Sequence, residues 1–129
     1  MAIYRTGGLD AVTAISSALS DATRVRLLAA LFQGELCVCQ LVMLVELAQS
    51  TVSKHLSILR QAGLVKARRD GRYQYFSLAG EESTMLIRGV IAWLVKTLAN
   101  DPQIAADDAK IREIMAMPLE EICRTGATS

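Results

Sequence analysis

Two cysteines separated by a single residue, Cys37 and Cys39, are the residues of this chain best suited to chemistry. Thiolates are soft ligands, so the pair suits a thiophilic ion and does not suit magnesium or calcium. Cys37 and Gln40 have the spacing of a capping box, which predicts Cys37 at the N-cap of a helix and Cys39 in its first turn. In a regular helix, side chains at this spacing point about 200° apart. We therefore expect the first turn to bend or unwind before both sulfurs bind one ion.

The third cysteine, Cys123, lies far along the chain. It could complete a three-thiolate site from its own subunit or from a partner subunit, or it could be an idle exposed thiol. Because three cysteines cannot all pair within one chain, the sequence favours free thiols in a reducing compartment and a cytoplasmic protein. A disulfide between Cys37 and Cys39 would be strained, and both residues could instead be small buried members of a core.

Positive charge is concentrated in one part of the chain. The whole sequence has a net charge of +1, whereas residues 50–75 hold six basic residues and one acidic residue, a net charge of +5. Such a cluster is typical of a phosphate-binding face, although an ordinary solvated surface would look the same. No apolar run approaches the roughly 20 residues of a membrane span, so we expect no membrane partner.

The chain length and the apolar periodicity predict a mainly helical domain. With 129 residues, 52% of them hydrophobic and 5% aromatic, the core must be aliphatic. We predict helices over 9–19, from Ser20 or Asp21 to Gly34, over 38–47, and from about 50 to 62. Two strands, 64–69 and 73–78, should follow, joined by the hairpin signal Asp70-Gly71. Two short helices followed by a hairpin make a winged helix-turn-helix with a small β-hairpin wing.

A later helix over residues 82–99 is apolar around most of its circumference. It must be covered on more than one face, and a second copy of the chain is the expected cover, which predicts a homodimer. We therefore expect residues 1–100 to form the DNA-binding and dimerisation domain and residues 101–129 to form a C-terminal helix and tail. A two-fold dimer would match an inverted-repeat operator.

Three stretches give the chain a resemblance to a known family. They are residues 19–28 (LSDATRVRLL), 49–56 (QSTVSKHL) and 63–65 (GLV). Together they resemble the ArsR/SmtB family of metal-responsive repressors, and residues 35–39 (ELCVC) resemble the metal-binding box of its arsenic-, antimony-, cadmium- and lead-responsive members. The resemblance implies a repressor that leaves double-stranded operator DNA when As(III), or Sb(III), Cd or Pb, binds Cys37 and Cys39. The box commonly carries a third cysteine where this chain has Val42, so Cys123 is the candidate third ligand.

The resemblance also indicates which residues contact DNA. We expect the start of the recognition helix to enter the major groove and the hairpin tip to reach a neighbouring groove or the backbone. The helix residues are Gln49, Ser50, Thr51, Ser53 and Lys54, with His55 as a weak contact, and the wing residues are Arg69, Arg72 and Tyr73. The family's other sensing site needs histidines on the dimer helix. Residues 82–99 contain no histidine and only Glu82 as an acid, which disfavours a zinc or nickel sensor.

Other classes of protein fit the sequence less well. A thiol enzyme would need a base and an oxyanion-binding loop beside its nucleophile, and one histidine without a glycine-rich phosphate loop argues against catalysis. A winged helix used only for protein contacts would not need the basic segment. A repressor that responds to thiol oxidation through Cys37 and Cys39 stays open. We therefore expect a regulator and not an enzyme.

Overall fold

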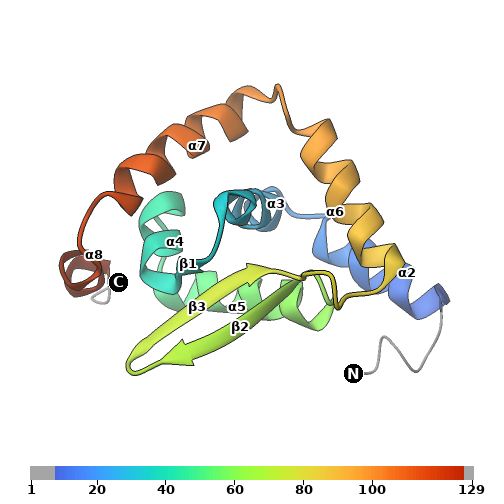
Figure 1. Ribbon diagram of the computed structural model, residues 1–129, viewed down its shortest axis with the longest axis horizontal. Coiled ribbons are helices and arrows are strands. Elements are labelled where there is room, and N and C mark those ends of the chain that lie inside the picture. Colours follow the sequence, from blue (N-terminus) through green and yellow to red (C-terminus); the bar gives the residue numbers. More distant parts are fainter. Residues whose placement is uncertain (1–7, 127–129) are drawn as a thin grey trace.

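The computed structural model describes residues 8–126, which form helices around one small sheet (Figure 1). The elements in chain order are α2 (Gly8–Ala18), α3 (Ala22–Ala30), the short 3-10 helix η1 (Leu31–Gln33), β1 (Leu36–Cys37), α4 (Val38–Val45), α5 (Gln49–Gln61), β2 (Val65–Asp70), β3 (Tyr73–Leu78), α6 (Met85–Thr97), α7 (Pro102–Met115) and α8 (Leu119–Gly126). The predicted fold class, mainly α with a hairpin wing, is confirmed. Residues 1–7 and 127–129, the ends of the two predicted segments, lie outside the described residues.

The helix-turn-helix consists of α4 and α5, which pack together through aliphatic side chains. In α5, Val52, Leu56 and Leu59 are fully buried at the predicted i, i+4 and i+7 positions. In α4, Leu41 and Leu44 are also fully buried. Because one face of α5 is committed to this core, its opposite face must point to solvent.

The sheet has one more strand than the predicted hairpin. Its order is β1-β3-β2, and β1 pairs antiparallel with β3 through Leu36 opposite Phe76 and Cys37 opposite Tyr75. Two residues are too few to give a periodic signal in a sequence, so β1 was not predicted. Its position means that the backbone of Cys37 belongs to the same sheet as the wing.

The hairpin turn is displaced by one residue from the prediction. Asp70 pairs with Tyr73 across the strands, so the two-residue loop is Gly71-Arg72 and not Asp70-Gly71. Gly71 has a φ of +63°, a conformation that glycine adopts without steric cost. The predicted strands are otherwise confirmed, and Arg72 lies at the tip of the wing.

An exposed apolar surface lies between α2 and α6. The helix predicted over residues 82–99 is present as α6, and its Met85, Leu86 and Trp93 are exposed although they are large and apolar. An apolar groove of about 310 Å³ runs between the two helices, lined by Val12, Ile15, Ser16, Leu19, Leu86, Val90 and Trp93. Within residues 8–126, the helices are all too short or too polar to cross a membrane.

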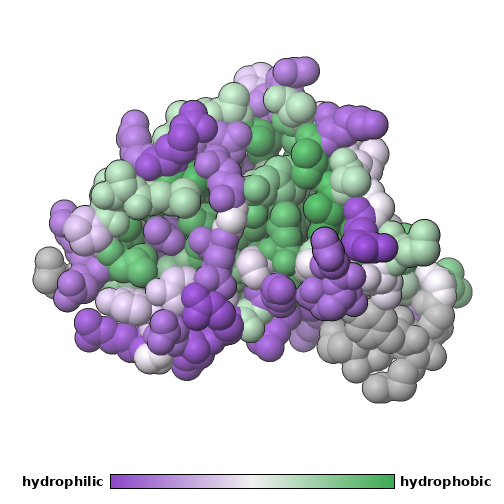
Figure 2. Space-filling view, viewed as in Figure 1, coloured by the Kyte–Doolittle hydropathy of each residue, from purple (hydrophilic) through white to green (hydrophobic). Residues whose placement is uncertain are grey.

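The C-terminal helices wrap around the winged helix. Figure 1 shows α6 and α7 as an arch over α3, with α8 beside α4. Ile111 and Ile114 of α7 and Ile122 of α8 are buried in the same hydrophobic core as the winged helix. On the face seen in Figure 2, apolar residues gather beneath the arch and hydrophilic residues cover the wing. The part predicted as a tail therefore includes a packed helix, α8.

Asp21 caps the N-terminus of α3, as one of the two predicted candidates. Its Oδ1 accepts a hydrogen bond from the Arg24 backbone N–H at 3.1 Å. This hydrogen bond lowers the pKa of Asp21.

Replacing Asp21 by alanine should lower the free energy of unfolding by about 1 kcal/mol at neutral pH, measured by urea denaturation, whereas Ser20→Ala should change it little. Because the folded-state pKa is depressed, the contribution is complete above the unfolded-state pKa and is lost as pH falls through the folded-state value. The difference between wild type and Asp21→Ala should therefore shrink in acid, and a constant difference would contradict this role.

Candidate functional site

The start of α4 holds Cys37 in a defined position. Cys37 is the N-cap, with φ −76° and ψ 150°, and its backbone N–H donates a hydrogen bond to Gln40 Oε1 at 2.8 Å. This confirms the capping box predicted from the spacing of the two residues. The Cys37 side chain is 1% exposed and carries a free thiol.

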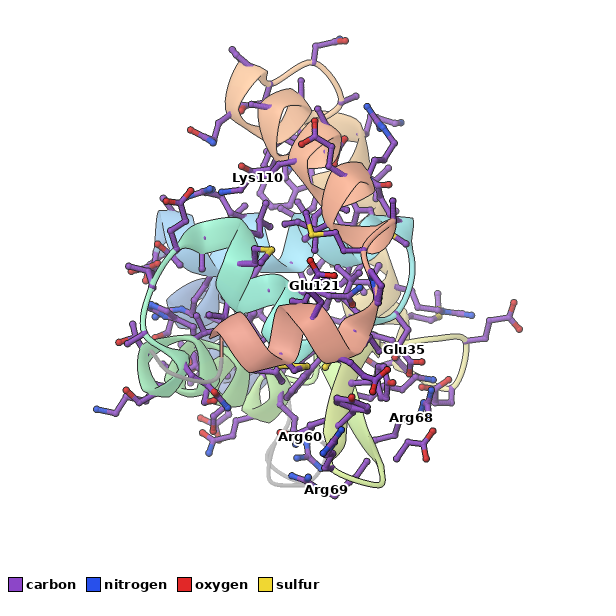
Figure 3. The ribbon with its side chains drawn as sticks, turned by 90° about the vertical axis from the view of Figure 1, so that its left-hand side faces the viewer. Glu35, Arg60, Arg68, Arg69, Lys110 and Glu121 are labelled. Carbon is purple, nitrogen blue, oxygen red and sulfur yellow. A yellow bond between two sulfur atoms is a disulfide. The ribbon has the colours of Figure 1, made fainter. Side chains whose placement is uncertain are left out.

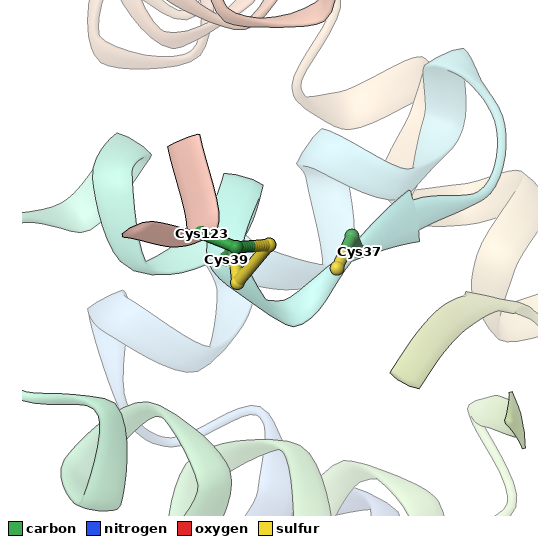
Figure 4. A group of neighbouring side chains, drawn as sticks. All are labelled: Cys37, Cys39 and Cys123. Carbon is green, nitrogen blue, oxygen red and sulfur yellow. A yellow bond between two sulfur atoms is a disulfide. The ribbon is translucent and has the colours of Figure 1, made fainter. Parts of the chain in front are cut away.

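Three cysteine sulfurs meet at this point (Figure 4). Cys39 lies in the first turn of α4, and Cys123 comes from α8, where its Cα is 5.1 Å from that of Cys39. The sulfur atoms of Cys37, Cys39 and Cys123 all lie within 4.8 Å of one another. The structure therefore brings together the three cysteines that the sequence named as candidate ligands.

The expectation that all three thiols are free is wrong, and the geometric premise for unwinding α4 does not apply. Cys39 and Cys123 are joined by a disulfide, so the three thiols are not all free, and the disulfide does not join Cys37 to Cys39. The first turn of α4 also does not need to unwind for the sulfurs of Cys37 and Cys39 to approach each other. The 200° separation applies only when both residues have helical backbone, whereas the N-cap backbone of Cys37 is extended.

Charged and aromatic side chains connect the thiol cluster to the wing. Tyr75 lies opposite Cys37, and its pKa is raised, first by burial and then by its electrostatic interaction with Cys37. The Arg68 guanidinium lies over the Tyr75 ring, with 4.5 Å from Cζ to the ring centroid, and donates two hydrogen bonds of 2.7 Å to Glu35. These hydrogen bonds lower the pKa of Glu35. Glu35, the residue before β1, is therefore linked to Arg68 of β2.

The predicted DNA-contacting residues of α5 share one exposed face. Ser50, Thr51, Ser53 and Lys54 are exposed, and Gln49 is half-buried. His55 is also half-buried, and its Nδ1 lies 3.2 Å from Arg24 Nη1 of α3. This contact connects α5 to α3.

The wing presents a second basic group. Arg69 and Arg72 are exposed, and the Arg72 guanidinium lies 5.5 Å from the centroid of the half-buried Tyr73 ring. Figure 3 shows Arg60 and Arg69 at the same end of the molecule, with Arg68 beside Glu35. The basic segment is thus partly neutralised by acids from outside it, because Arg68 pairs with Glu35 and Lys66 with Glu82.

Sequence reasoning missed the ion pairs that hold these elements together. Arg26 of α3 pairs with the buried Asp107 of α7, and Lys110 of α7 pairs with Glu46 at the end of α4. The residues of each pair are more than sixty positions apart, so no local pattern could indicate the contact. The one signal within a single helix was Asp107, an acid on the apolar side of α7.

Comparison with known proteins identifies the family. Residues 21–67 match the model described as bacterial regulatory protein, arsR family. The chain is 35% identical over 104 residues to the arsenic resistance transcriptional regulator ArsR1 of Pseudomonas putida, an alignment that covers 78% of this chain and 77% of that protein. The chain belongs to the arsR family.

Two further proteins resemble this arsR-family chain, one in sequence and one in fold. It is 49% identical over 74 residues to a Synechocystis transcriptional repressor SmtB homologue, over 57% of this chain and 56% of that protein, so it spans little more than half the length of that relative. Its fold matches the homodimeric winged helix-turn-helix DNA-binding domain of Mb0332 from Mycobacterium bovis with a TM-score of 0.60 and 34% identity, over 73% of this chain and 82% of the other. The winged helix-turn-helix fold of this chain is therefore shown by structure and by comparison.

Proposed function

We propose that this arsR-family chain is a homodimeric transcriptional repressor that leaves its operator when Cys37, Cys39 and Cys123 bind As(III) or Sb(III). The observation that carries the proposal is the approach of three cysteine sulfurs to within 4.8 Å of one another at the start of α4. This cluster adjoins the DNA-contacting helix, because α4 packs directly on α5. The Pseudomonas putida relative, named as an arsenic resistance regulator, supports the same ligand class.

The donor set favours a three-coordinate ion. Arsenous acid reacts with three thiols to form three As–S bonds and release three water molecules, and each hydroxyl leaves with one thiol proton. Zinc in structural sites takes four ligands. Within residues 8–126, the cluster holds three cysteines and no histidine or carboxylate. Three thiolates match the bonding of As(III) and Sb(III) better than that of a tetrahedral ion.

A redox-responsive repressor is the second candidate, and the disulfide between Cys39 and Cys123 favours it. Reduction of this disulfide takes up two electrons and two protons and yields two thiols. Arsenite can form three As–S bonds at this site only after that reduction. The disulfide and the metalloid complex are therefore alternative states of the same cluster.

The DNA-binding part of the proposal uses the exposed face of α5 and the wing. Gln49, Ser50, Thr51, Ser53 and Lys54 would enter the major groove, with His55 as a weak contact, while Arg69, Arg72 and Tyr73 would contact DNA from the wing. The exposed apolar surface between α2 and α6 would be covered by the second copy, as the homodimeric Mycobacterium bovis relative suggests. Two recognition helices related by a two-fold axis fit half-sites about one DNA turn apart.

Release would follow from the connections of Cys37. Three bonds to one atom draw the sulfurs together, and any movement of Cys37 acts on β1, which is paired with β3 of the wing. Movement of Cys39 acts on α4 and so on the position of α5. Ligand binding and DNA binding would then be reciprocally linked.

The test is operator binding, measured by fluorescence anisotropy with inverted-repeat DNA from the upstream region of the gene. With protein reduced by a phosphine, arsenite and antimonite should each lower operator affinity by about 10- to 100-fold. Oxidised protein should not respond to arsenite. Release by cadmium or lead alone would change the inducer, and a difference between oxidised and reduced protein without any ion would support the redox candidate. Binding that is indifferent to every ion would refute the metalloid proposal.

A further inference from the structure

The segment that carries Cys123 is joined to the winged helix by an ion pair with a buried carboxylate. Asp107 of α7 is 5% exposed and accepts two hydrogen bonds from the guanidinium of Arg26 on α3, Nε to Oδ2 at 2.8 Å and Nη2 to Oδ1 at 3.0 Å. Gln103 Nε2 donates to the same Oδ1 at 3.0 Å. A bidentate arginine–carboxylate pair accepts one geometry, so it fixes both the position and the rotation of α7.

Stability alone does not explain a charge at this position. Asp107 loses its hydration on burial, while the Arg26 side chain stays 27% exposed, so the ion pair contributes little more to stability than well-packed apolar residues of similar volume. The same side of α7 already buries Ile104, Ile111 and Ile114. Those aliphatic contacts would tolerate a small slide of the helix, whereas the ion pair would not. The pair therefore specifies the register of α7 on α3.

A second contact ties α7 to the helix of the thiol cluster. Lys110 Nζ donates a hydrogen bond of 2.9 Å to the backbone oxygen of Leu44 in α4 and also pairs with Glu46. Lys110 of α7 contacts the C-terminal end of α4, while Cys39 in the first turn of α4 contacts Cys123 of α8. Both ends of α4 thus contact the C-terminal helices.

The position of α7 determines the position of α8, because the connection between the two helices is short. Only residues 116–118 separate Met115, the end of α7, from Leu119, the start of α8. Ile122 is fully buried in the shared core, and the next residue is Cys123. A displacement of α7 would therefore move Cys123 away from Cys39.

We propose that Arg26 and Asp107 are positioning residues of the thiol site, which hold α7 and α8 against α4 of the same chain so that Cys123 supplies the third thiolate in cis. Neither residue touches the bound atom. This inference rests on the proposed function for its arsenic measurement. Its first test does not depend on arsenic.

The first test measures the thiol–disulfide equilibrium with glutathione. In this reaction the thiols of Cys39 and Cys123 reduce one molecule of glutathione disulfide. The products are the protein disulfide and two molecules of reduced glutathione. The equilibrium constant reports the effective concentration of one thiol at the other. Asp107→Ala should lower it by about 10-fold or more, and the milder Asp107→Asn should lower it less, whereas Asp108→Ala, the matched control on α7, should leave it unchanged. The oxidised protein should migrate as a monomer on a non-reducing gel. An unchanged constant in Asp107→Ala, or disulfide-linked dimers, would overturn the proposal.

The second test counts sulfur neighbours of bound arsenic by X-ray absorption. Wild type should show three, whereas Asp107→Ala should show two while binding operator normally. In the Cys123→Ser background, Asp107→Ala should cause no further loss of arsenite affinity, because a purely structural residue would weaken both backgrounds alike. Three sulfurs in Asp107→Ala would overturn the positioning role. If the wild type binds no arsenite, the proposed function fails, and the glutathione equilibrium still decides the role of Asp107.

Discussion

Replacement of Cys39 by alanine should abolish the release of operator DNA by arsenite. Wild-type protein should lose about 100-fold in operator affinity when saturated with arsenite, near the upper end of typical allosteric coupling. The variant should lose none, because only one sulfur then remains at the start of α4, and with Cys123 alone it would not hold arsenic tightly enough to move β1 or α4. Operator affinity is measured by anisotropy with reduced protein, with and without arsenite.

The other two cysteines provide the comparison for this prediction. Cys37→Ala should behave like Cys39→Ala, and alanine is preferred to serine there because the side chain is 1% exposed and a buried hydroxyl would need a partner. Cys123→Ser should keep part of the response, since two sulfurs remain at the start of α4. All three variants should bind operator like wild type in the absence of arsenite. Full release in Cys39→Ala would show that the cluster is not the sensor.

Replacement of Lys54 by glutamate should lower operator affinity by about 100-fold at low salt. Lys54 is exposed in the second turn of α5, where under the proposed function a cation would face the DNA phosphates, and a dimer would carry the change twice. Lys54→Ala should have a smaller effect and should reduce the slope of log affinity against log salt concentration by about 2, one for each lost phosphate contact. Both quantities come from anisotropy titrations across a salt series.

Arg112→Glu is the matched control for this charge reversal. Arg112 is exposed on α7, which lies on the opposite side of the molecule from α5 and the wing (Figure 1). The control has the same change in net charge, so a similar loss of affinity in Arg112→Glu would mean that total charge, and not the face of α5, controls DNA binding. Arsenite should bind the Lys54 variants as it binds wild type.

The ion pairs refine the electrostatic prediction from the sequence. The net charge of +5 over residues 50–75 includes Lys66 and Arg68. In the structure Lys66 pairs with Glu82 and Arg68 pairs with Glu35, so the charges of both cations are neutralised. Within the described residues, the ion pairs leave out Lys54, Arg60, Arg69 and Arg72. Of the six cations in residues 50–75, these four would remain for phosphate contacts, and they come from α5 and the wing.

The sequence alone determined the elements that rest on local patterns. The spacing of Val52, Leu56 and Leu59 identified the buried face of α5, because a helix of 3.6 residues per turn places them on one side. Cys37 and Gln40 identified the capping box, and the glycine at position 71 identified the hairpin, although its loop was displaced by one residue. Each signal depends on neighbours within about two turns of helix or one hairpin, and these interactions can be read from a short window of residues.

The tertiary structure alone decided how distant segments meet. Cys123 joins Cys39 across 84 residues, Asp107 is paired with Arg26, and the short strand β1 is paired with β3. The sequence left open whether Cys123 was a ligand or an idle thiol, since a single cysteine has no periodicity. Its position follows from the packing of α7 and α8 on α3 and α4. That packing is the sum of many contacts between residues far apart in the chain, and no local pattern in the sequence records it.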